Sequence, residues 1–150
     1  MTKNEKVIVY VDGGSRGNPG PSAVGVVVLN ETGQKIKEYA HKLEEISTNN
    51  EAEYEAVIFS LKKLRQLFGK EKTMKLDVEF KLDSELIASQ LGGKYKIIEE
   101  RMQMLFMKVW NLKFGFDKIS FKSIPREENK RADELVNQAL DGAGESGKLV

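Results

Sequence analysis

The sequence predicts a single α/β domain built on a five-stranded mixed sheet. Three strand-like segments with hairpin-length connections come first, and helices alternate with two further strands after them. This order is typical of an antiparallel meander of strands 1–3, followed by strands 4 and 5 that lie parallel to strand 1, with helices flanking the sheet. At 150 residues, of which 40% are hydrophobic, the chain is long enough to bury one ordinary globular core.

The predicted meander occupies the first third of the chain. Residues 7–11 have no polar break, so this strand is expected to be buried on both faces. Residues 23–30 form the second strand, and a turn at 31–34 leads into a third strand at 35–43, whose lysines suit an exposed edge. We expect the single histidine, His41, to lie on the surface of that edge strand.

Helices and strands alternate in the rest of the chain. Residues 47–50 offer several helix-capping side chains just before a predicted helix at 51–68. The remaining predicted elements are a strand at 76–82, a short helix at 84–91, a helix at 97–113, a strand at 118–123 and a helix at 127–141. We expect one domain over 1–141 and a flexible C-terminal tail over 142–150, because that end is rich in glycine.

Composition excludes several kinds of chemistry. The chain has no cysteine, which excludes disulfides, thiolate catalysis and thiolate metal sites. No segment approaches a membrane-spanning length and the N-terminus lacks the apolar stretch of a signal peptide, so a cytoplasmic location is expected. Net charge is only +1, yet residues 94–131 hold ten Lys or Arg and five Asp or Glu. That excess suits a phosphate-binding ridge or, equally, a solvated helix face rich in lysine.

Two aspartates stand at the carboxyl ends of strands that are predicted to be parallel neighbours. Asp12 follows the first strand and opens a loop of small residues, which a large ligand can approach closely. Asp83 ends the fourth strand in the same way. Because ligands bind at this edge of open α/β sheets, we expect the two carboxylates to lie together there. Taken singly, Asp12 could be a turn residue and Asp83 a helix N-cap.

Helical spacing places two further carboxylates. Glu53 has apolar neighbours one turn further on at Ala56 and Val57, which predicts an inward-facing side chain. Asp133 borders the apolar stripe of the last helix through Val136. Taken singly, Glu53 could serve the positive N-terminus of its helix and Asp133 could be a charge at the border of a helix face.

Four acids gathered in one place require a cation. Carboxylates held together repel one another and are costly to desolvate unless they are neutralised. A ligand set made only of oxygen suits Mg²⁺ or Mn²⁺ better than metals that prefer nitrogen or sulfur. We therefore predict one divalent-metal site formed by Asp12, Glu53, Asp83 and Asp133.

Four motifs follow one another along nearly the whole chain. They are Asp-Gly…Gly-Asn-Pro-Gly-Pro, Thr-Asn-Asn-x-x-Glu, Leu-Asp-Ser and Arg-Glu-Glu-Asn-x-x-x-Asp. In this order and spacing the sequence resembles the type 1 ribonuclease H family, from about residue 7 to residue 141. It is most similar to the compact archaeal and bacterial branch, because residues 94–116 are too few to hold the basic handle region of the longer enzymes.

The resemblance implies an endoribonuclease that hydrolyses the RNA strand of RNA–DNA hybrids and leaves 5′-phosphate and 3′-hydroxyl ends. It implies that the four carboxylates are catalytic and bind two Mg²⁺ ions, with Mn²⁺ as a substitute, and that Asp12 bridges the ions. Such ions lie roughly 3.5–4 Å apart, one activating the attacking water and the other stabilising the departing 3′ oxygen. A monomer without membrane contact is expected.

The resemblance also implies a set of substrate contacts. Telling RNA from DNA requires contact with the 2′-hydroxyl, which the family makes near the first glycines and the asparagine pair. The predicted substrate-binding residues are Gly13, Gly14, Asn18, Thr48, Asn49, Asn50, Glu85, Arg126 and Asn129, where Glu85 replaces a more usual neutral amide. Sequence-independent attraction of phosphates is predicted for Lys94, Lys96, Lys122, Arg126, Lys130 and Arg131.

The loop before the last helix departs from the family pattern. Many relatives have a histidine there, whereas residues 123–128 contain none, and Arg126 could either take over its role in product departure or simply attract phosphate. Two other functions stay open: a non-catalytic hybrid-binding module, and a metal nuclease that also acts on double-stranded RNA. Core packing is favoured over a base-stacking surface for a group at helical spacing, namely Met102, Met104, Met107 and Trp110.

Overall fold

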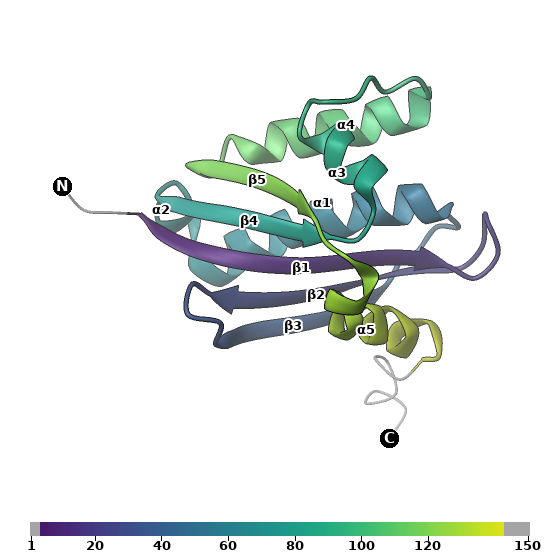
Figure 1. Cartoon of the computed structure of the whole chain (residues 1–150), viewed down its shortest axis with the longest axis horizontal. Coiled ribbons are helices and arrows are strands. Elements are labelled where there is room, and N and C mark those ends of the chain that lie inside the picture. The colour runs from purple at the N-terminus through teal and green to yellow at the C-terminus, as the bar shows by residue number, and fades with distance from the viewer. Residues whose placement is uncertain (1–3, 143–150) are drawn as a thin grey trace.

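In the computed structural model, residues 4–142 are described and form alternating strands and helices (Figure 1). The elements are β1 (Glu5–Ser15), β2 (Ser22–Asn30), β3 (Lys35–Lys42), α1 (Asn49–Phe68), α2 (Lys70–Thr73), β4 (Leu76–Leu82), α3 (Glu85–Leu91), α4 (Glu100–Lys113), β5 (Lys118–Ser123), a 3-10 turn (Arg126–Glu128) and α5 (Lys130–Leu140). Several features differ from the prediction: β1 is longer at both ends, α1 begins two residues earlier, α4 begins three residues later, the last helix is divided at Asn129, and α2 was not expected. The predicted tail lies outside the described residues, apart from Gly142.

The sheet has the strand order β3-β2-β1-β4-β5. β2 pairs antiparallel with both β1 and β3, whereas β4 lies parallel to β1 and β5 lies parallel to β4. The structure therefore confirms the predicted five-stranded mixed sheet, with a meander first and parallel strands added through helical crossovers. Among residues 4–142, no helix combines the length and the apolar character needed to cross a membrane.

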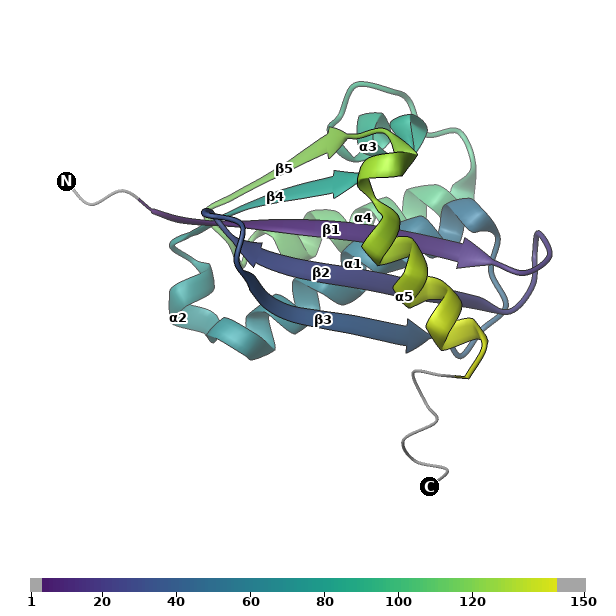
Figure 2. The same ribbon diagram turned by 60° about the horizontal axis from the view of Figure 1, so that its bottom comes forward.

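Helices cover the two faces of the sheet unequally. Figure 2 shows α5 in front of the sheet, whereas α1, α2 and α4 lie behind it. Val7, Val9 and Val11 of β1 point into the main core and are buried, but Ile8 and Tyr10 on the other face are only half-buried. The expectation that this strand is buried on both faces is thus wrong for its α5 side, because the short α5 covers only part of that face.

β3 is the exposed edge strand that its lysines predict. His41 lies on this strand, is exposed, and stacks on Phe59 of α1 with ring centroids 4.8 Å apart. Its predicted place on the surface is confirmed.

The apolar residues of α4 form two stripes rather than one. Met102, Leu105 and Val109 are at most 5% exposed and pack in the core. Met104, Met107 and Trp110 are 58%, 53% and 44% exposed and lie on the outer side of the helix. Core packing is therefore confirmed for Met102 and wrong for the other three, because helical spacing alone does not say which of two apolar stripes meets the sheet.

Candidate active site

The separation of β1 from β4 opens the site. Their parallel pairing ends at Tyr10 and Lys81, while β1 continues antiparallel to β2 as far as Ser15. Asp12 therefore lies inside β1 rather than in the loop that the sequence suggests, and Asp83 follows the last residue of β4. Both side chains stand where two parallel strands diverge, which is the place where open α/β sheets bind ligands.

Gly13 brings β1 against the first turns of α1. A Cβ atom at this position would lie 2.1 Å from the Ala52 carbonyl oxygen and 2.6 Å from the Glu53 nitrogen, which are both backbone atoms. Only glycine permits such a close approach. Asp12 and Glu53, each adjacent to this contact, are thereby held next to each other.

A second glycine contact places α5. Gly25 of β2 is the register partner of Asp12, and a Cβ atom there would lie 2.2 Å from the Ala132 carbonyl oxygen. The backbone of α5 therefore rests directly on β2 beside Asp12. Asp133, the next residue of that helix, is brought to the same end of the sheet.

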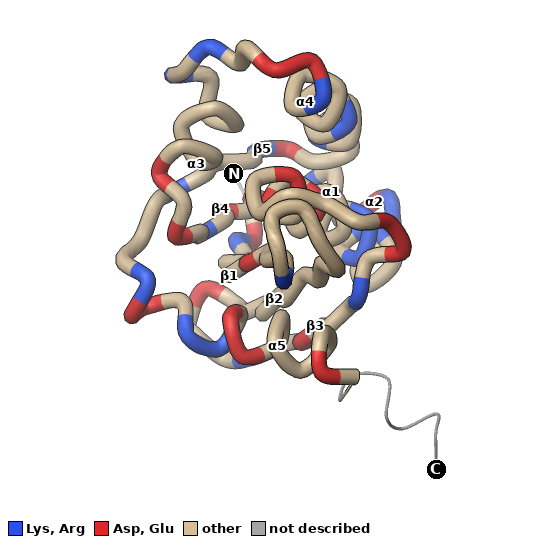
Figure 3. The backbone as a smooth tube through the Cα atoms, turned by 90° about the vertical axis from the view of Figure 1, so that its right-hand side faces the viewer, with Lys and Arg blue, Asp and Glu red and all other residues tan. Residues whose placement is uncertain are grey.

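Three of the four predicted carboxylates meet. Asp12, Glu53 and Asp83 each offer an oxygen, and these oxygens all lie within 4.8 Å of one another. The exposed Asp133 lies outside this set but lines the same pocket of about 320 Å³. Figure 3 looks onto this end of the molecule and shows acidic segments of β1, β4, α1 and α5 around it.

Burial makes ionisation of the carboxyl groups in this cluster unfavourable. Desolvation, followed by the charges of Asp83, Glu53 and Asp133, raises the pKa of Asp12 to about 8. Desolvation and the charge of Asp83 raise the pKa of Glu53 to about 8, against a smaller opposing effect of Arg126. Without a cation the cluster holds protons near neutral pH, whereas a bound divalent ion would favour full ionisation.

Other residues perform the structural roles that these acids could have had. Thr48 is the N-cap of α1 and forms a reciprocal capping box with Glu51, so Glu53 is not needed at that helix end. Ser84 caps α3 by accepting a hydrogen bond from the Ile87 amide. The N-cap alternative for Asp83 is therefore excluded.

Hydrogen bonds join the glycine-rich loop to the start of α1. The Asn49 amide donates to Asn18 Oδ1, and the Ser15 amide donates to Asn49 Oδ1, both at 2.9 Å. Asn18, Asn49 and Asn50 are exposed, and Asn49 lines the acidic pocket with Gly13 and Gly14. Thr48 is half-buried in its cap, and the exposed Glu85 begins α3. Contact of these residues with substrate stays a prediction.

Asn129 differs from the other predicted substrate residues. It is 1% exposed, and its Nδ2 donates to the Val11 carbonyl oxygen at 2.8 Å and to Asp83 Oδ2 at 3.1 Å. A side chain this deeply buried lies beneath the site. This burial makes Asn129 a poor candidate for direct contact with substrate, and its contact with substrate stays an untested prediction.

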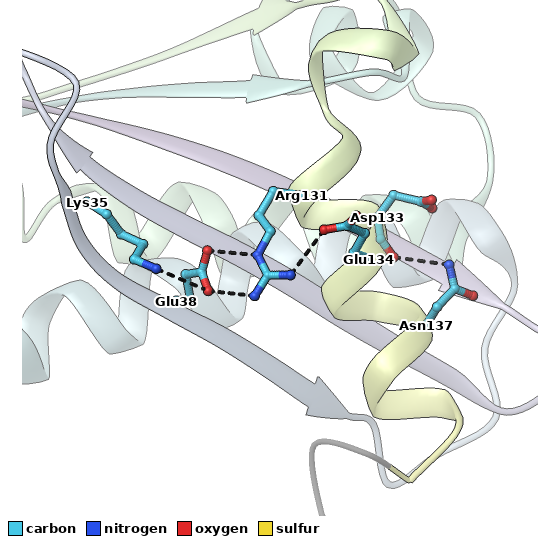
Figure 4. Close-up of polar contacts among 6 residues, drawn as sticks. All are labelled: Lys35, Glu38, Arg131, Asp133, Glu134 and Asn137. Atoms are coloured by element: carbon cyan, nitrogen blue, oxygen red, sulfur yellow. Dashed lines mark hydrogen bonds and ion pairs between the residues drawn. The ribbon is translucent and has the colours of Figure 1, made fainter.

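Of the six predicted basic residues, Lys94, Lys96 and Lys122 are exposed and line neither the acidic pocket nor the hollow beside it, and the other three fall into two groups. Arg126 lines the acidic pocket, and Lys130 lies beside Arg126 and Asp133 in an adjoining hollow. Arg131 instead points toward β3, where it forms two hydrogen bonds with Glu38 and a third with Glu134 (Figure 4). Because two carboxylates neutralise its charge, Arg131 is a poor candidate for attracting phosphate.

Two residues at the pocket escaped the sequence interpretation. Arg16 and Asn137 line the pocket and hydrogen-bond to each other at 3.3 Å. Asn137 lies four residues after Asp133, and Arg16 directly follows β1, the strand that contains Gly13 and Gly14. The i+4 spacing on one helix face was the signal that could have identified Asn137.

Comparison with known proteins identifies the family of the chain. Residues 10–139 match the family model described as reverse transcriptase-like. A ribonuclease HI of Halobacterium salinarum is 38% identical over 138 residues, which are 92% of this chain and 66% of that protein. A bifunctional protein of Mycobacterium tuberculosis is 33% identical over 94% of this chain and 37% of its own length. The chain thus spans less than two thirds of these relatives.

Solved structures agree in fold over nearly their whole length. The ribonuclease H1 called LC11, isolated from compost by a metagenomic approach, has a TM-score of 0.85 and 44% identity, covering 92% of this chain and 97% of that one. The same LC11 enzyme has also been solved in complex with an RNA/DNA hybrid, again with a TM-score of 0.85.

Proposed function

The chain belongs to the ribonuclease H family of hydrolases, in its compact H1 form, and we propose that it hydrolyses the RNA strand of RNA–DNA hybrids. The observation that carries this proposal is the meeting of Asp12, Glu53 and Asp83 within 4.8 Å at the open end of β1 and β4. The hybrid complex of the LC11 relative supports the choice of substrate. Products with 5′-phosphate and 3′-hydroxyl ends would follow from attack by water on the RNA phosphate with departure of the 3′ oxygen, which takes up a proton.

The donor set fits divalent cations. Every ligand it offers is a carboxylate oxygen, which Mg²⁺ and Mn²⁺ prefer, and burial together with the charges of neighbouring acids raises the pKa values of Asp12 and Glu53 to about 8. Asp12, Glu53, Asp83 and Asp133 would hold two Mg²⁺ ions or Mn²⁺ in their place. Such ions supply an activated water and stabilise the leaving oxygen.

The remaining residues of the pocket would orient the hybrid. Gly13 and Gly14 line the pocket beside the acids, and Asn49 stands at the positive N-terminal end of α1, where it is fixed by its bonds to Ser15 and Asn18. These groups suit contacts to sugar and phosphate, which position a nucleic acid without regard to its sequence.

Arg126 takes a separate part in the proposal. It lines the pocket, and its charge opposes the rise of the pKa of Glu53. We assign it the attraction of phosphate near the site, which includes the departing product end. It thereby supplies positive charge in the loop where many relatives have a histidine.

A cleavage assay with matched substrates tests the proposal. The full chain is incubated with a labelled RNA–DNA hybrid, a double-stranded RNA and a DNA duplex holding one ribonucleotide, each with Mg²⁺, with Mn²⁺ and with a chelator. We expect cuts in the RNA strand of the hybrid with either metal and none with the chelator. A ligase should join the products through their 5′ ends, and removal of the 5′-phosphate by a phosphatase should prevent this ligation.

Two outcomes would contradict the proposal. Tight binding of the hybrid with no cleavage across a metal titration would indicate a non-catalytic binding module. Faster cleavage of double-stranded RNA than of the hybrid would change the substrate class.

A further inference from the structure

Asn129 occupies the N-cap of α5 but does not cap it. Asparagine is among the most favoured N-cap residues because its side-chain oxygen accepts a hydrogen bond from the second or third amide of the helix. Here the side chain makes no capping bond, with backbone angles φ −118° and ψ 25°. The side chain is turned away from its own helix and into the protein, where it is 1% exposed.

The amide group of Asn129 joins two strands at the point where they separate. Its Nδ2 donates to the Val11 carbonyl oxygen, in the residue before Asp12, and to one carboxylate oxygen of Asp83. The parallel pairing of β1 and β4 ends at Tyr10 and Lys81, one residue before Val11 and two before Asp83. The –NH₂ group thus connects the two chain segments just beyond the end of their pairing.

The carbonyl oxygen of the same side-chain amide makes no hydrogen bond within residues 4–142. This atom, Asn129 Oδ1, is buried. A buried acceptor without a partner is unfavourable. The contacts of this side chain are therefore made by its donor group, and those contacts lead to Asp83 and to the backbone beside Asp12.

We propose that Asn129 is a positioning residue that holds the Asp83 carboxylate in the orientation facing Asp12 and Glu53. This inference rests on the proposed metal-dependent function and deepens it. One oxygen of Asp83 is tied to Asn129, which leaves the other for the shared cation. Because Asn129 is also the N-cap residue of α5, it links the placement of Asp83 to the helix that carries Asp133 four residues later.

The Asn129→Ser variant separates this role from a role in folding. The Asn129 side chain makes no capping bond and serine is tolerated at an N-cap, so the start of α5 should be kept, but the short serine hydroxyl cannot bridge Val11 and Asp83. Outer-shell partners of metal ligands typically contribute about 10–100-fold in metal affinity or activity. We expect Mn²⁺ affinity, measured by calorimetry without substrate, to fall about 10-fold or more in Asn129→Ser and in Asn129→Ala.

The kinetic readout divides the possible roles. We expect kcat at fixed Mg²⁺ to fall by about 10-fold or more and to recover partly as the metal concentration is raised, with the KM for hybrid unchanged within about twofold. Asn111→Ser, at an exposed position near the end of α4, is the matched control. It should keep the wild-type Mn²⁺ affinity.

Two results would overturn the assignment. Unchanged Mn²⁺ affinity in a folded Asn129→Ser protein, with only a lower unfolding temperature, would make Asn129 a purely structural residue. A raised KM with normal metal affinity would return it to substrate binding. Because Mn²⁺ binding is measured without nucleic acid, failure of the wild-type chain to cleave hybrids would count against the proposed function and not against this inference.

Discussion

Two carboxylate clusters of this molecule differ in where their positive charge comes from. At the β3–α5 contact, Arg131 lies between Glu38 and Glu134, and its hydrogen bonds lower the pKa of Glu38 (Figure 4). At the ends of β1 and β4, burial and mutual repulsion raise the pKa values of Asp12 and Glu53 to about 8. The first cluster is complete within the chain, whereas the second is stable in its ionised form only with a cation from solution.

The same helix serves both clusters. Arg131 and Asp133 are two residues apart in α5, so their side chains leave the helix in different directions, and Figure 4 shows the Asp133 carboxylate pointing away from the Arg131 network. The hydrogen bonds of Arg131 with Glu38 connect α5 to the edge strand β3, and with α5 in this position Asp133 lines the pocket.

The largest effect is expected from removing one charge of the incomplete cluster. Asp12→Asn should lower the rate of hybrid cleavage by about 1000-fold or more, because bound metal ions stabilise the transition state by several kcal/mol. Single-turnover cleavage with Mg²⁺ measures it. Asp117→Asn makes the same change of net charge at an exposed residue before β5 and should keep activity within about twofold. Substantial cleavage by Asp12→Asn would contradict the metal site.

Metal-free stability should fall as pH rises from about 5 to about 8. The folded state keeps protons on Asp12 and Glu53 that the unfolded chain releases near pH 4, so each unit of pH in this window favours unfolding. In urea unfolding with chelator at pH 8, the free energy of unfolding of Asp12→Asn should exceed that of the wild type by about 1 kcal/mol or more. A pKa shift of one unit corresponds to about this free energy. Added Mg²⁺ should reverse the order. If the difference in the free energy of unfolding between Asp12→Asn and the wild type did not depend on pH, the pKa values of Asp12 and Glu53 would not be raised in the folded state.

A smaller effect is expected from the cation that lies beside the incomplete cluster. Arg126→Ala should weaken hybrid binding several-fold and lower the slope of binding against salt by about one ion, as the loss of one phosphate contact does. Binding of the catalytically silent Asp12→Asn background at several salt concentrations measures this. Arg65→Ala, at an exposed residue near the end of α1, is the control. An unchanged salt slope would exclude Arg126 from phosphate attraction.

The smallest effect is expected at the complete cluster. Glu38→Gln removes the two-bond partner of Arg131 and should lower the free energy of unfolding by about 0.5–1 kcal/mol, since such partly exposed pairs are weak. The loss should shrink in high salt, because screening weakens the pair in the wild type. Urea unfolding at two salt concentrations measures it. Mn²⁺ affinity should be unchanged, and a clear loss of affinity would show that the two clusters are not separate.

The local sequence patterns predicted the architecture well because they depend on which neighbouring residues are buried. The strand alternation in β4, the lysines of β3 and the capping residues before α1 each have a nearby physical cause. The same reasoning misplaced Met104, Met107 and Trp110, which share helical spacing with the buried stripe of α4. Spacing shows that a stripe exists, but contact with the sheet decides which stripe is covered.

The elements, their order and the residue types that meet at one end of the sheet could be predicted from the amino-acid sequence, since periodicity, capping and strand ends depend on neighbouring residues. The approach of three acids within 4.8 Å, with Asp133 outside that set, became visible only in the folded chain. The tertiary structure alone showed that Arg131 is neutralised by Glu38 and that Asn129 lies beneath the site. These facts depend on backbone contacts at Gly13 and Gly25, which join residues distant in the chain, and no local pattern reports the distance between such residues.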